Sequence, residues 1–329
     1  MLSGDEADDG DSSVRFSIDI RQSTTRGERS RTIENSRESP LNRLAHRGLR
    51  WLQMIGIAVA AALIFWTIAL MLFEDKFIYF PEKYPRGAYD QAGSIPNLRD
   101  CWITAEDGVK LHGWFAAAES AKATLVLSHG NGGNISYRYL VMRSLVHHKF
   151  NVLMYDYRGY GRSEGTPSEE GIYKDGRAVF DYAATLPEVN PNRVILWGTS
   201  LGGAVAIDVA THRAAAGLIL ESTFSSGKDV ARMLYPFLPV GLFMRSKFNS
   251  IDKITTLHLP LLVMHGSHDE ILPIGLGRRL FAAANYPKEF YEIPGAGHND
   301  TFFVGGEEYF DRIDRFASTI LVSPAPPVR

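Results

Sequence analysis

A serine flanked by glycines, placed directly after a short apolar run, constrains this 329-residue chain more than any other feature. Residues 194–197 are Val-Ile-Leu-Trp, and Gly198-Thr199-Ser200-Leu201-Gly202 follows them. The apolar run indicates a buried strand, and a serine on a sharp turn from strand to helix has strained backbone dihedrals. Side chains two residues away on either side would crowd such a turn, which accounts for the glycines. The pattern predicts a strand, a tight turn that presents the Ser200 hydroxyl, and a helix that starts at Leu201.

Two later segments can supply the base and the acid that a nucleophilic serine requires. Asp269 follows an apolar run typical of a buried strand, and His298 lies in a glycine-rich loop after another strand. We predict Ser200 as the nucleophile, His298 as the general base and Asp269 as the acid that orients the base. Glu221, at the end of a further strand, is the alternative acid.

An earlier glycine-rich loop can supply hydrogen-bond donors to a reacting carbonyl oxygen. Residues 124–128 (Thr-Leu-Val-Leu-Ser) lead into His129-Gly130-Asn131-Gly132-Gly133-Asn134. Preorganised amides that face the negative charge of a tetrahedral intermediate can lower the barrier by about 3–4 kcal/mol. We predict the backbone N–H groups of Asn131 and Leu201 as these oxyanion donors.

These motifs resemble those of α/β-hydrolases, in which the nucleophile, acid and base occur in the chain order Ser, Asp, His. More narrowly, the chain is similar to membrane-anchored α/β-hydrolase-domain proteins. That similarity rests on residues 77–81 (Phe-Ile-Tyr-Phe-Pro), the His-Gly-Asn motif and residues 155–163 (Tyr-Asp-Tyr-Arg-Gly-Tyr-Gly-Arg-Ser). It extends from about Asp75 to the end of the chain. The resemblance implies a serine hydrolase mechanism without a cofactor, and leaves esterase, thioesterase, lipase and peptidase activities open.

Strand-like and helix-like segments alternate through the last three quarters of the chain. Strands are expected at residues 102–104, 111–115, 124–128, 151–155, 194–198, 217–221, 261–264 and 289–293. Helices are expected near residues 136–148, 169–186, 201–212, 275–285 and 306–320. This alternation predicts an α/β fold with a doubly wound, mostly parallel sheet.

Residues 223–259 interrupt the alternation and are rich in large apolar side chains. We expect a short helical cap over the serine. Its apolar residues either line an acyl-chain pocket or pack the cap onto the sheet.

The N-terminal part divides into a polar tail and an apolar segment. Residues 1–50 lack hydrophobic periodicity and are predicted to be a disordered tail, and residues 51–73 to be a transmembrane signal-anchor helix. Residues 54–73 contain no charged side chain, although a buried core helix would share this property. Three arginines and no acidic residue in the ten positions before Trp51 favour a cytosolic N-terminus. Residues 74–329 would then form the hydrolase domain on the opposite side of the membrane.

Composition narrows the classes of partner. The net charge is −2, and arginines and lysines are not interleaved with aromatic residues, so nucleic-acid binding is not expected. Cys101 is the only cysteine, which excludes an intramolecular disulfide and a cysteine-based metal cluster. Arg158 and Arg162 either bind an anionic substrate group or anchor their loop. The remaining histidines considered as bases are interpreted as structural: His129, His147, His148, His265 and His268.

The sequence thus predicts a single-pass membrane-anchored serine hydrolase. It would cleave acyl ester or thioester bonds of small, lipid-like or acylated substrates through an acyl-enzyme, with no cofactor and no metal. The alternatives are a peptidase or amidase that uses the same three residues, and a non-catalytic binding protein that has kept the fold.

Overall fold

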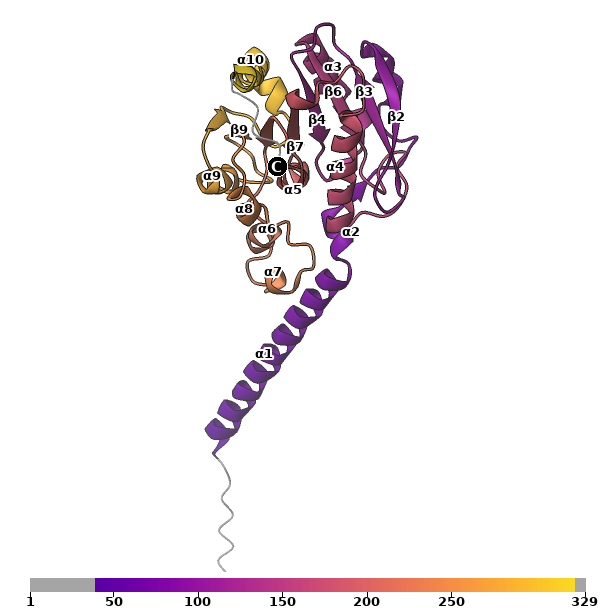
Figure 1. The fold of residues 1–329 in the computed structure, drawn as a ribbon. Coiled ribbons are helices and arrows are strands. Elements are labelled where there is room, and N and C mark those ends of the chain that lie inside the picture. Colours follow the sequence, from indigo (N-terminus) through magenta and orange to yellow (C-terminus); the bar gives the residue numbers. More distant parts are fainter. Residues whose placement is uncertain (1–38, 323–329) are drawn as a thin grey trace, which may run out of the picture. The chain divides into compact units, whose positions relative to one another are not determined.

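The computed structural model describes residues 39–322, and eight of its strands form a single twisted sheet (Figure 1). Their spatial order is β10-β9-β8-β7-β4-β6-β3-β2. The strands are β2 (Leu98–Thr104), β3 (Lys110–Ala116), β4 (Ala123–Ser128), β6 (Phe150–Tyr155), β7 (Val194–Thr199), β8 (Gly217–Glu221), β9 (Leu261–Gly266) and β10 (Lys288–Ile293). From β10 to β6 every neighbouring pair is parallel, whereas β3 and β2 join as antiparallel edge strands. The expected doubly wound, mostly parallel sheet is confirmed.

Helices cover both faces of this sheet. One face carries α3 (Tyr139–His147) and α10 (Thr301–Val322), and the other carries α4 (Glu169–Ala183), α5 (Leu201–His212) and α9 (Ile274–Ala283). Because successive side chains of a strand point to opposite faces, both faces of the sheet carry apolar side chains that helices cover.

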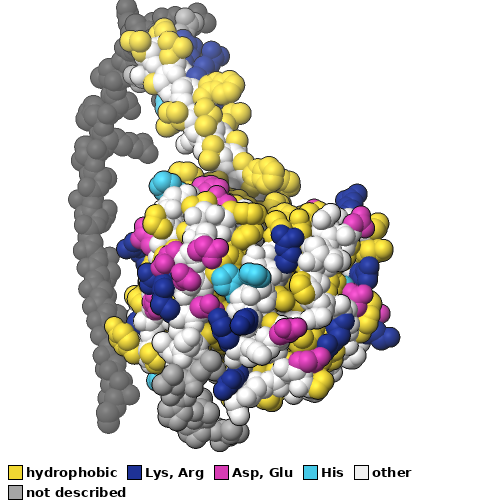
Figure 2. Space-filling model, turned by 90° about the horizontal axis from the view of Figure 1, so that it is seen from above, with side chains coloured by type: hydrophobic (Ala, Val, Ile, Leu, Met, Phe, Trp, Pro, Cys, Tyr) yellow, Lys and Arg dark blue, Asp and Glu magenta, His cyan; other side chains and the backbone are white. Residues whose placement is uncertain are grey.

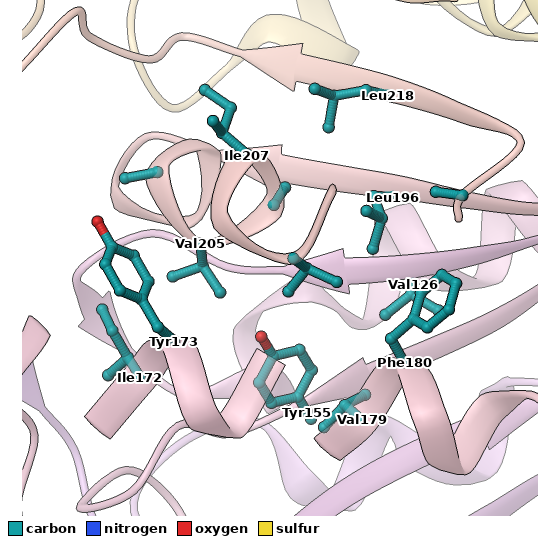
Figure 3. Close-up of a cluster of buried hydrophobic side chains, with 14 of the residues drawn as sticks. Val126, Tyr155, Ile172, Tyr173, Val179, Phe180, Leu196, Val205, Ile207 and Leu218 are labelled. Carbon is teal, nitrogen blue, oxygen red and sulfur yellow. The ribbon is translucent and has the colours of Figure 1, made fainter. Parts of the chain in front are cut away.

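The core shows this alternation directly. In β4, Leu125 belongs to the cluster under α3 and α10, whereas Val126 belongs to the cluster under α4 and α5. Figure 3 shows Val126 and Leu196 of the sheet on the same side as Phe180 of α4 and Val205 of α5.

Two of the expected helices are divided in the structure. The helix expected at 136–148 begins as a 3₁₀ turn, η2 (Ile135–Arg138), before α3. The helix expected near residues 306–320 corresponds to the second of two helical segments of α10, which meet at a kink where Gly306 has a φ of 53°. The first segment, from Thr301, is the part of α10 that the sequence pattern did not indicate.

The cap expected at residues 223–259 lies between β8 and β9. It contains α6 (Gly227–Leu234), α7 (Val240–Phe243) and α8 (Ser250–Ile254). Phe248 is buried against Phe224 and Tyr173, so this aromatic side chain packs the cap onto the rest of the fold. Phe237 and Leu242, in contrast, are 86% and 71% exposed.

Helix α1 (Pro40–Leu72) contains the predicted transmembrane segment. Among the described residues, α1 is the one helix whose length and apolar composition would allow it to cross a membrane. It starts at Pro40, so residues 40–50 are helical and do not belong to a disordered tail as predicted. The physical reason is the Ser39-Pro40 pair: the Ser39 hydroxyl accepts a hydrogen bond from the Asn42 amide at 3.2 Å, and proline suits the first position of a helix. The rest of the predicted tail lies outside the described residues.

A short segment that follows α1 packs across the loops at one edge of the sheet. It comprises α2 (Glu74–Ile78), β1 (Phe80–Pro81) and η1 (Tyr89–Ser94), and β1 pairs in parallel with β5 (Gly132–Gly133).

On the face of the molecule in Figure 2, acidic and basic side chains are interspersed rather than gathered by sign.

Candidate active site

Ser200 lies at the turn between β7 and α5 with a strained backbone. Its φ of 54° and ψ of −117° are rare for a residue with a side chain. The amide of Ser200 donates a hydrogen bond to the carbonyl of Glu221 at 2.9 Å, and its own carbonyl accepts one from the Thr223 hydroxyl at 2.7 Å. These two bonds from the end of β8 and the residues after it hold the turn in place.

Two glycines make the turn possible. A side chain at Gly202 would overlap with the carbonyl oxygen of Ser128 at the end of β4. One at Gly203 would overlap with the Thr223 hydroxyl. Gly202 and Gly203 therefore allow α5 to approach the ends of the neighbouring strands closely.

The structure brings Ser200, His298 and Asp269 together. Nε2 of His298 lies 3.1 Å from the Ser200 hydroxyl, and Nδ1 of His298 lies 2.8 Å from Oδ2 of Asp269. Because an ionised carboxylate only accepts, the Nδ1–H donates to Asp269 and leaves Nε2 able to accept from Ser200. The three side chains follow β7, β9 and β10, where parallel strands present their carboxyl ends at one edge.

Asp269 is held by several donors. Its Oδ1 accepts the amides of Ile271 at 3.0 Å and Leu272 at 2.7 Å, and Nε2 of His265 lies 3.3 Å from Oδ2. Burial alone would raise the pKa of Asp269, but the hydrogen bonds from His265, His298 and the Leu272 amide outweigh burial and hold the pKa well below its usual range. The side chain stays ionised throughout the neutral range.

His265 is a residue whose contact the sequence reasoning missed. It was interpreted as structural, yet its Nε2 lies near both Asp269 and the carbonyl of Leu272, the latter at 2.7 Å. The available signal was its position at the end of a strand, four residues before the proposed acid.

Glu221, the alternative acid, serves other partners. Its Oε1 accepts the hydroxyls of Thr301 at 2.6 Å and Tyr309 at 2.8 Å. Its Oε2 accepts Trp197 Nε1 at 3.2 Å and the Thr199 hydroxyl at 3.0 Å. The carboxylate is buried with all its acceptor capacity in use, and its partners in the described residues do not include His298.

The two predicted oxyanion donors flank the serine. Leu201 is the first residue of α5, and the first amides of an α-helix lack an intrahelical acceptor. Asn131 follows Gly130, where a Cβ atom would lie 3.5 Å from the Cβ of Ser200. Within residues 39–322, neither the Asn131 amide nor the Leu201 amide donates a hydrogen bond to a backbone carbonyl. Both amides are therefore available to donate to the oxygen of a carbonyl group whose carbon Ser200 attacks.

The loop that carries Asn131 is fixed from two sides. The Asn131 carbonyl accepts the Tyr160 hydroxyl at 2.8 Å and the Phe80 amide at 2.9 Å, and the Asn131 side chain donates to the Ile78 carbonyl at 2.9 Å. The Tyr157 hydroxyl donates to the preceding carbonyl of His129 at 2.6 Å. The segment after α1 and the loop after β6 thus set the direction of the Asn131 peptide.

A cavity of about 220 Å³ lies beside His298. It is bounded by the ends of β4, β7 and β8 and by the first residues of α3 and α10, and Arg138 contributes to its wall. No residue of the cap lines this cavity in the described part of the chain. The apolar cap residues that were considered for an acyl pocket do not form this one.

Arg158 and Arg162 anchor their loop. Arg158 pairs with Asp107 at 2.8 Å and with Asp175 at 2.7 Å, and the guanidinium of Arg162 lies 4.3 Å from the centre of the Tyr84 ring. Of the two roles that the sequence left open for these arginines, substrate binding and loop anchoring, these contacts favour loop anchoring. Among residues 39–322, no group of three or more His, Cys, Asp or Glu side chains is arranged to hold a metal ion.

Relatives of known sequence cover most of this chain. A family model described as serine aminopeptidase, S33, matches residues 119–250. An uncharacterized protein of Mycobacterium tuberculosis is 38% identical over 253 residues, which cover 76% of this chain and 89% of that protein. The alpha/beta hydrolase domain-containing protein WAV2 of Arabidopsis thaliana is 34% identical over 279 residues, which cover 78% of this chain and 89% of WAV2.

Solved structures show the same fold. An esterase of Pyrococcus furiosus superposes with a TM-score of 0.60 at 24% identity, over 74% of this chain and 98% of the esterase. Acetyl xylan esterase 1 from Thermoanaerobacterium superposes with a TM-score of 0.53 at 17% identity, over 71% of this chain and 91% of that enzyme. With the sheet order, the strained serine turn and the relatives in agreement, the chain belongs to the α/β-hydrolase family of hydrolases.

Proposed function

We propose that the protein is a membrane-anchored serine hydrolase that cleaves acyl ester or thioester bonds through an acyl-enzyme. The observation that carries this proposal is a pair of linked hydrogen bonds. One joins Asp269 to Nδ1 of His298 at 2.8 Å, and the other joins Nε2 of His298 to the Ser200 hydroxyl at 3.1 Å. A weak nucleophile next to an oriented base is the arrangement that acyl transfer requires.

In the proposed reaction, the Ser200 oxygen attacks the carbonyl carbon while Nε2 of His298 takes its proton. The resulting oxyanion accepts hydrogen bonds from the amides of Asn131 and Leu201. His298 then gives the proton to the leaving group, which departs and leaves Ser200 acylated. A water molecule, deprotonated by His298, attacks the acyl carbon and frees Ser200 by the same route in reverse.

Asp269 stabilises this cycle electrostatically. Its lowered pKa keeps a full negative charge next to Nδ1 of His298, and that charge favours the imidazolium formed in each step. The carboxylate also fixes the tautomer, because Nδ1–H is the donor that its oxygen needs.

The apolar helix and the cap support a membrane-bound substrate. Glu74, two residues after α1, accepts the amides of Arg245 at 2.8 Å and Ser246 at 2.6 Å with its buried carboxylate. These hydrogen bonds connect the cap to Glu74, the residue that directly follows the proposed membrane span. Exposed apolar side chains of the cap, such as Phe237 and Leu242, suit contact with acyl chains at a bilayer surface. We propose the N-terminus on the cytosolic side and the hydrolase domain opposite, by the distribution of arginines around the span.

A peptidase is the second candidate, because the matching family model is described as a serine aminopeptidase. An aminopeptidase must hold the ammonium group of its substrate near the serine, which calls for an available carboxylate. The cavity beside His298 instead has the guanidinium of Arg138 in its wall, and its carboxylate, Glu221, already accepts four hydrogen bonds. This charge pattern favours esters and thioesters over peptides with a free amino terminus.

The first test is labelling of the purified full-length protein with a fluorophosphonate probe, which reacts with activated serines whatever their substrate. Wild type and a Ser318→Ala control, changed at an exposed serine of α10, should be labelled, and Ser200→Ala should not. Absence of labelling in folded wild type would contradict the proposal of a serine hydrolase and would favour a non-catalytic binding protein. Release of aminocoumarin from peptides faster than hydrolysis of p-nitrophenyl esters would favour the peptidase.

A further inference from the structure

Arg138 places a cation next to the proposed nucleophile. A Cβ atom built on Gly130 would lie 4.0 Å from Nη2 of Arg138 and 3.5 Å from the Cβ of Ser200, so the guanidinium and the serine flank the same glycine. Nη1 of Arg138 would lie 3.6 Å from a Cβ atom on Gly133. The charge therefore lies along the oxyanion loop, within reach of a group a few bonds from the scissile carbonyl.

This guanidinium has little to neutralise it. Its hydrogen bond is to the Gly132 carbonyl at 3.3 Å, and in the described part of the chain no carboxylate lies within 4.0 Å of it. Asp156 and Glu221 attract it only from a greater distance, and burial lowers the pKa of Arg138. Arg158 differs from Arg138, since its guanidinium is paired with the carboxylates of Asp107 and Asp175.

The cavity beside His298 has a mixed wall that contains one cation, Arg138, and one carboxylate, Glu221. Apolar side chains, among them Leu127, Leu140, Val141 and Met154, share this wall with neutral polar side chains such as Ser128, Thr199 and Asn299. Glu221 also lines it, but its oxygens accept four hydrogen bonds from the protein. A guanidinium that is partly desolvated and lacks a carboxylate partner gains most from an anion that enters the same cavity.

We propose that Arg138 binds a negatively charged group of the substrate, a carboxylate or phosphate a few bonds from the scissile carbonyl. This inference rests on the proposed ester hydrolysis and specifies its substrate class: acyl esters or thioesters that carry an anion near the reacting bond. The anion can belong to the acyl group, as in the monoester of a dicarboxylic acid, or to the leaving group, as in an acylated glycerol phosphate.

The experiment compares matched pairs of substrates on the full-length protein in detergent micelles. For the acyl side, the pair is mono-p-nitrophenyl adipate and p-nitrophenyl hexanoate, which share chain length and leaving group. For the leaving-group side, the pair is butanoylglycerol phosphate and butanoylglycerol. The measured quantity is the ratio of kcat/KM for the anionic and neutral member, which does not depend on the fraction of folded protein in a preparation.

The expected result is a ratio at least tenfold above that of the spontaneous hydrolysis rates in one of the two pairs. Arg138→Gln should lower that ratio by about ten- to a hundredfold, as for a hydrogen bond between charged groups, and Arg138→Lys should lower it less. Arg143→Gln, a change at an exposed arginine of α3, should leave the ratio as in wild type. The pair that responds identifies the side of the substrate that carries the anion.

A wild-type protein without preference for either anionic substrate would overturn the proposal, as would equal ratios in wild type and Arg138→Gln. An equal loss of both rates in Arg138→Gln would also overturn it, because Arg138 would then only support the oxyanion loop. In each of these cases wild type still hydrolyses the neutral esters, and the fluorophosphonate still labels its Ser200. Failure of the proposed function itself would differ, since wild type would neither be labelled nor hydrolyse any ester.

Discussion

Replacement of Asp269 by asparagine tests the electrostatic core of the site with little change in shape. The asparagine oxygen can still accept the amides of Ile271 and Leu272, which now bond to Oδ1 at 3.0 and 2.7 Å. Its NH₂ group then takes the place of Oδ2 and faces Nδ1 of His298. Two donors cannot share a hydrogen bond, so the imidazole must move its proton to Nε2 and point that proton at Ser200.

The size of the effect follows from the lost tautomer. With Nε2 protonated, His298 cannot accept the serine proton, and an uncharged partner no longer stabilises the imidazolium. We expect kcat/KM to fall by about 10³- to 10⁴-fold, or roughly 4–5.5 kcal/mol of transition-state stabilisation. The fall should appear in kcat, because Asp269 has no proposed contact with the substrate. Since the pKa of Asp269 is held below its usual range, wild-type activity should not be lost through protonation of Asp269 above about pH 4.

The assay is hydrolysis of p-nitrophenyl butanoate together with the rate of fluorophosphonate labelling. Asp311→Asn, a change at an exposed aspartate of α10, is the matched control and should retain wild-type rates. Circular dichroism should show both variants folded. If folded Asp269→Asn keeps activity within tenfold of wild type, Asp269 does not orient the base and the reasoning fails.

Three further changes probe the loops around the serine. Tyr160→Phe removes the hydroxyl that bonds to the Asn131 carbonyl at 2.8 Å, and at about 1 kcal/mol for one hydrogen bond it should lower kcat roughly fivefold without unfolding the protein; an unchanged kcat would separate Tyr160 from the oxyanion loop. Gly202→Ala forces a methyl group against the Ser128 carbonyl, and we expect a loss of about 1–3 kcal/mol of stability, read as a lower Tm, together with a loss of activity. His129 is buried, and burial lowers its pKa to about 3. Between pH 6.5 and pH 3 the unfolded chain therefore binds a proton that the folded chain does not. The free energy of unfolding consequently falls as the pH falls through this range. Urea unfolding of wild type should therefore show an extra loss of about 2 kcal/mol between pH 7 and 5 that His129→Gln lacks, and equal losses in the two proteins would contradict the buried neutral imidazole.

The fold could be predicted because its signals are local. Most of the parallel strands are short apolar runs between turn residues, and they alternate with helix-like stretches, so alternation alone indicates a doubly wound sheet. The errors fall where tertiary context decides. The kink at Gly306 lets one element continue through a residue that usually ends helices, and the Ser39-Pro40 start extends an apolar helix into a polar sequence.

The candidate site was predictable where each residue follows a strand. Ser200, Asp269 and His298 each follow a strand that is recognisable in the sequence, and parallel strands bring their carboxyl ends together at one edge. His265 and Arg138 were not identified in these roles, because their meaning depends on distance. The proximity of His265 to Asp269, and the lack of a carboxylate near Arg138, are properties of the folded chain that no spacing rule contains.

The segment after α1 shows the same limit and has a functional consequence. Strand β1 has two residues, too few for any periodic pattern, and its partner β5 lies about fifty residues further along the chain. Yet the Phe80 amide and the Ile78 carbonyl bond directly to Asn131, the residue whose amide is proposed to bind the oxyanion. Glu74, in the same segment, holds the cap. Residues 74–81 therefore connect the proposed membrane span to both sides of the site, and a hydrolase domain without them would keep Ser200, His298 and Asp269 while it lost the bonds that direct the Asn131 peptide.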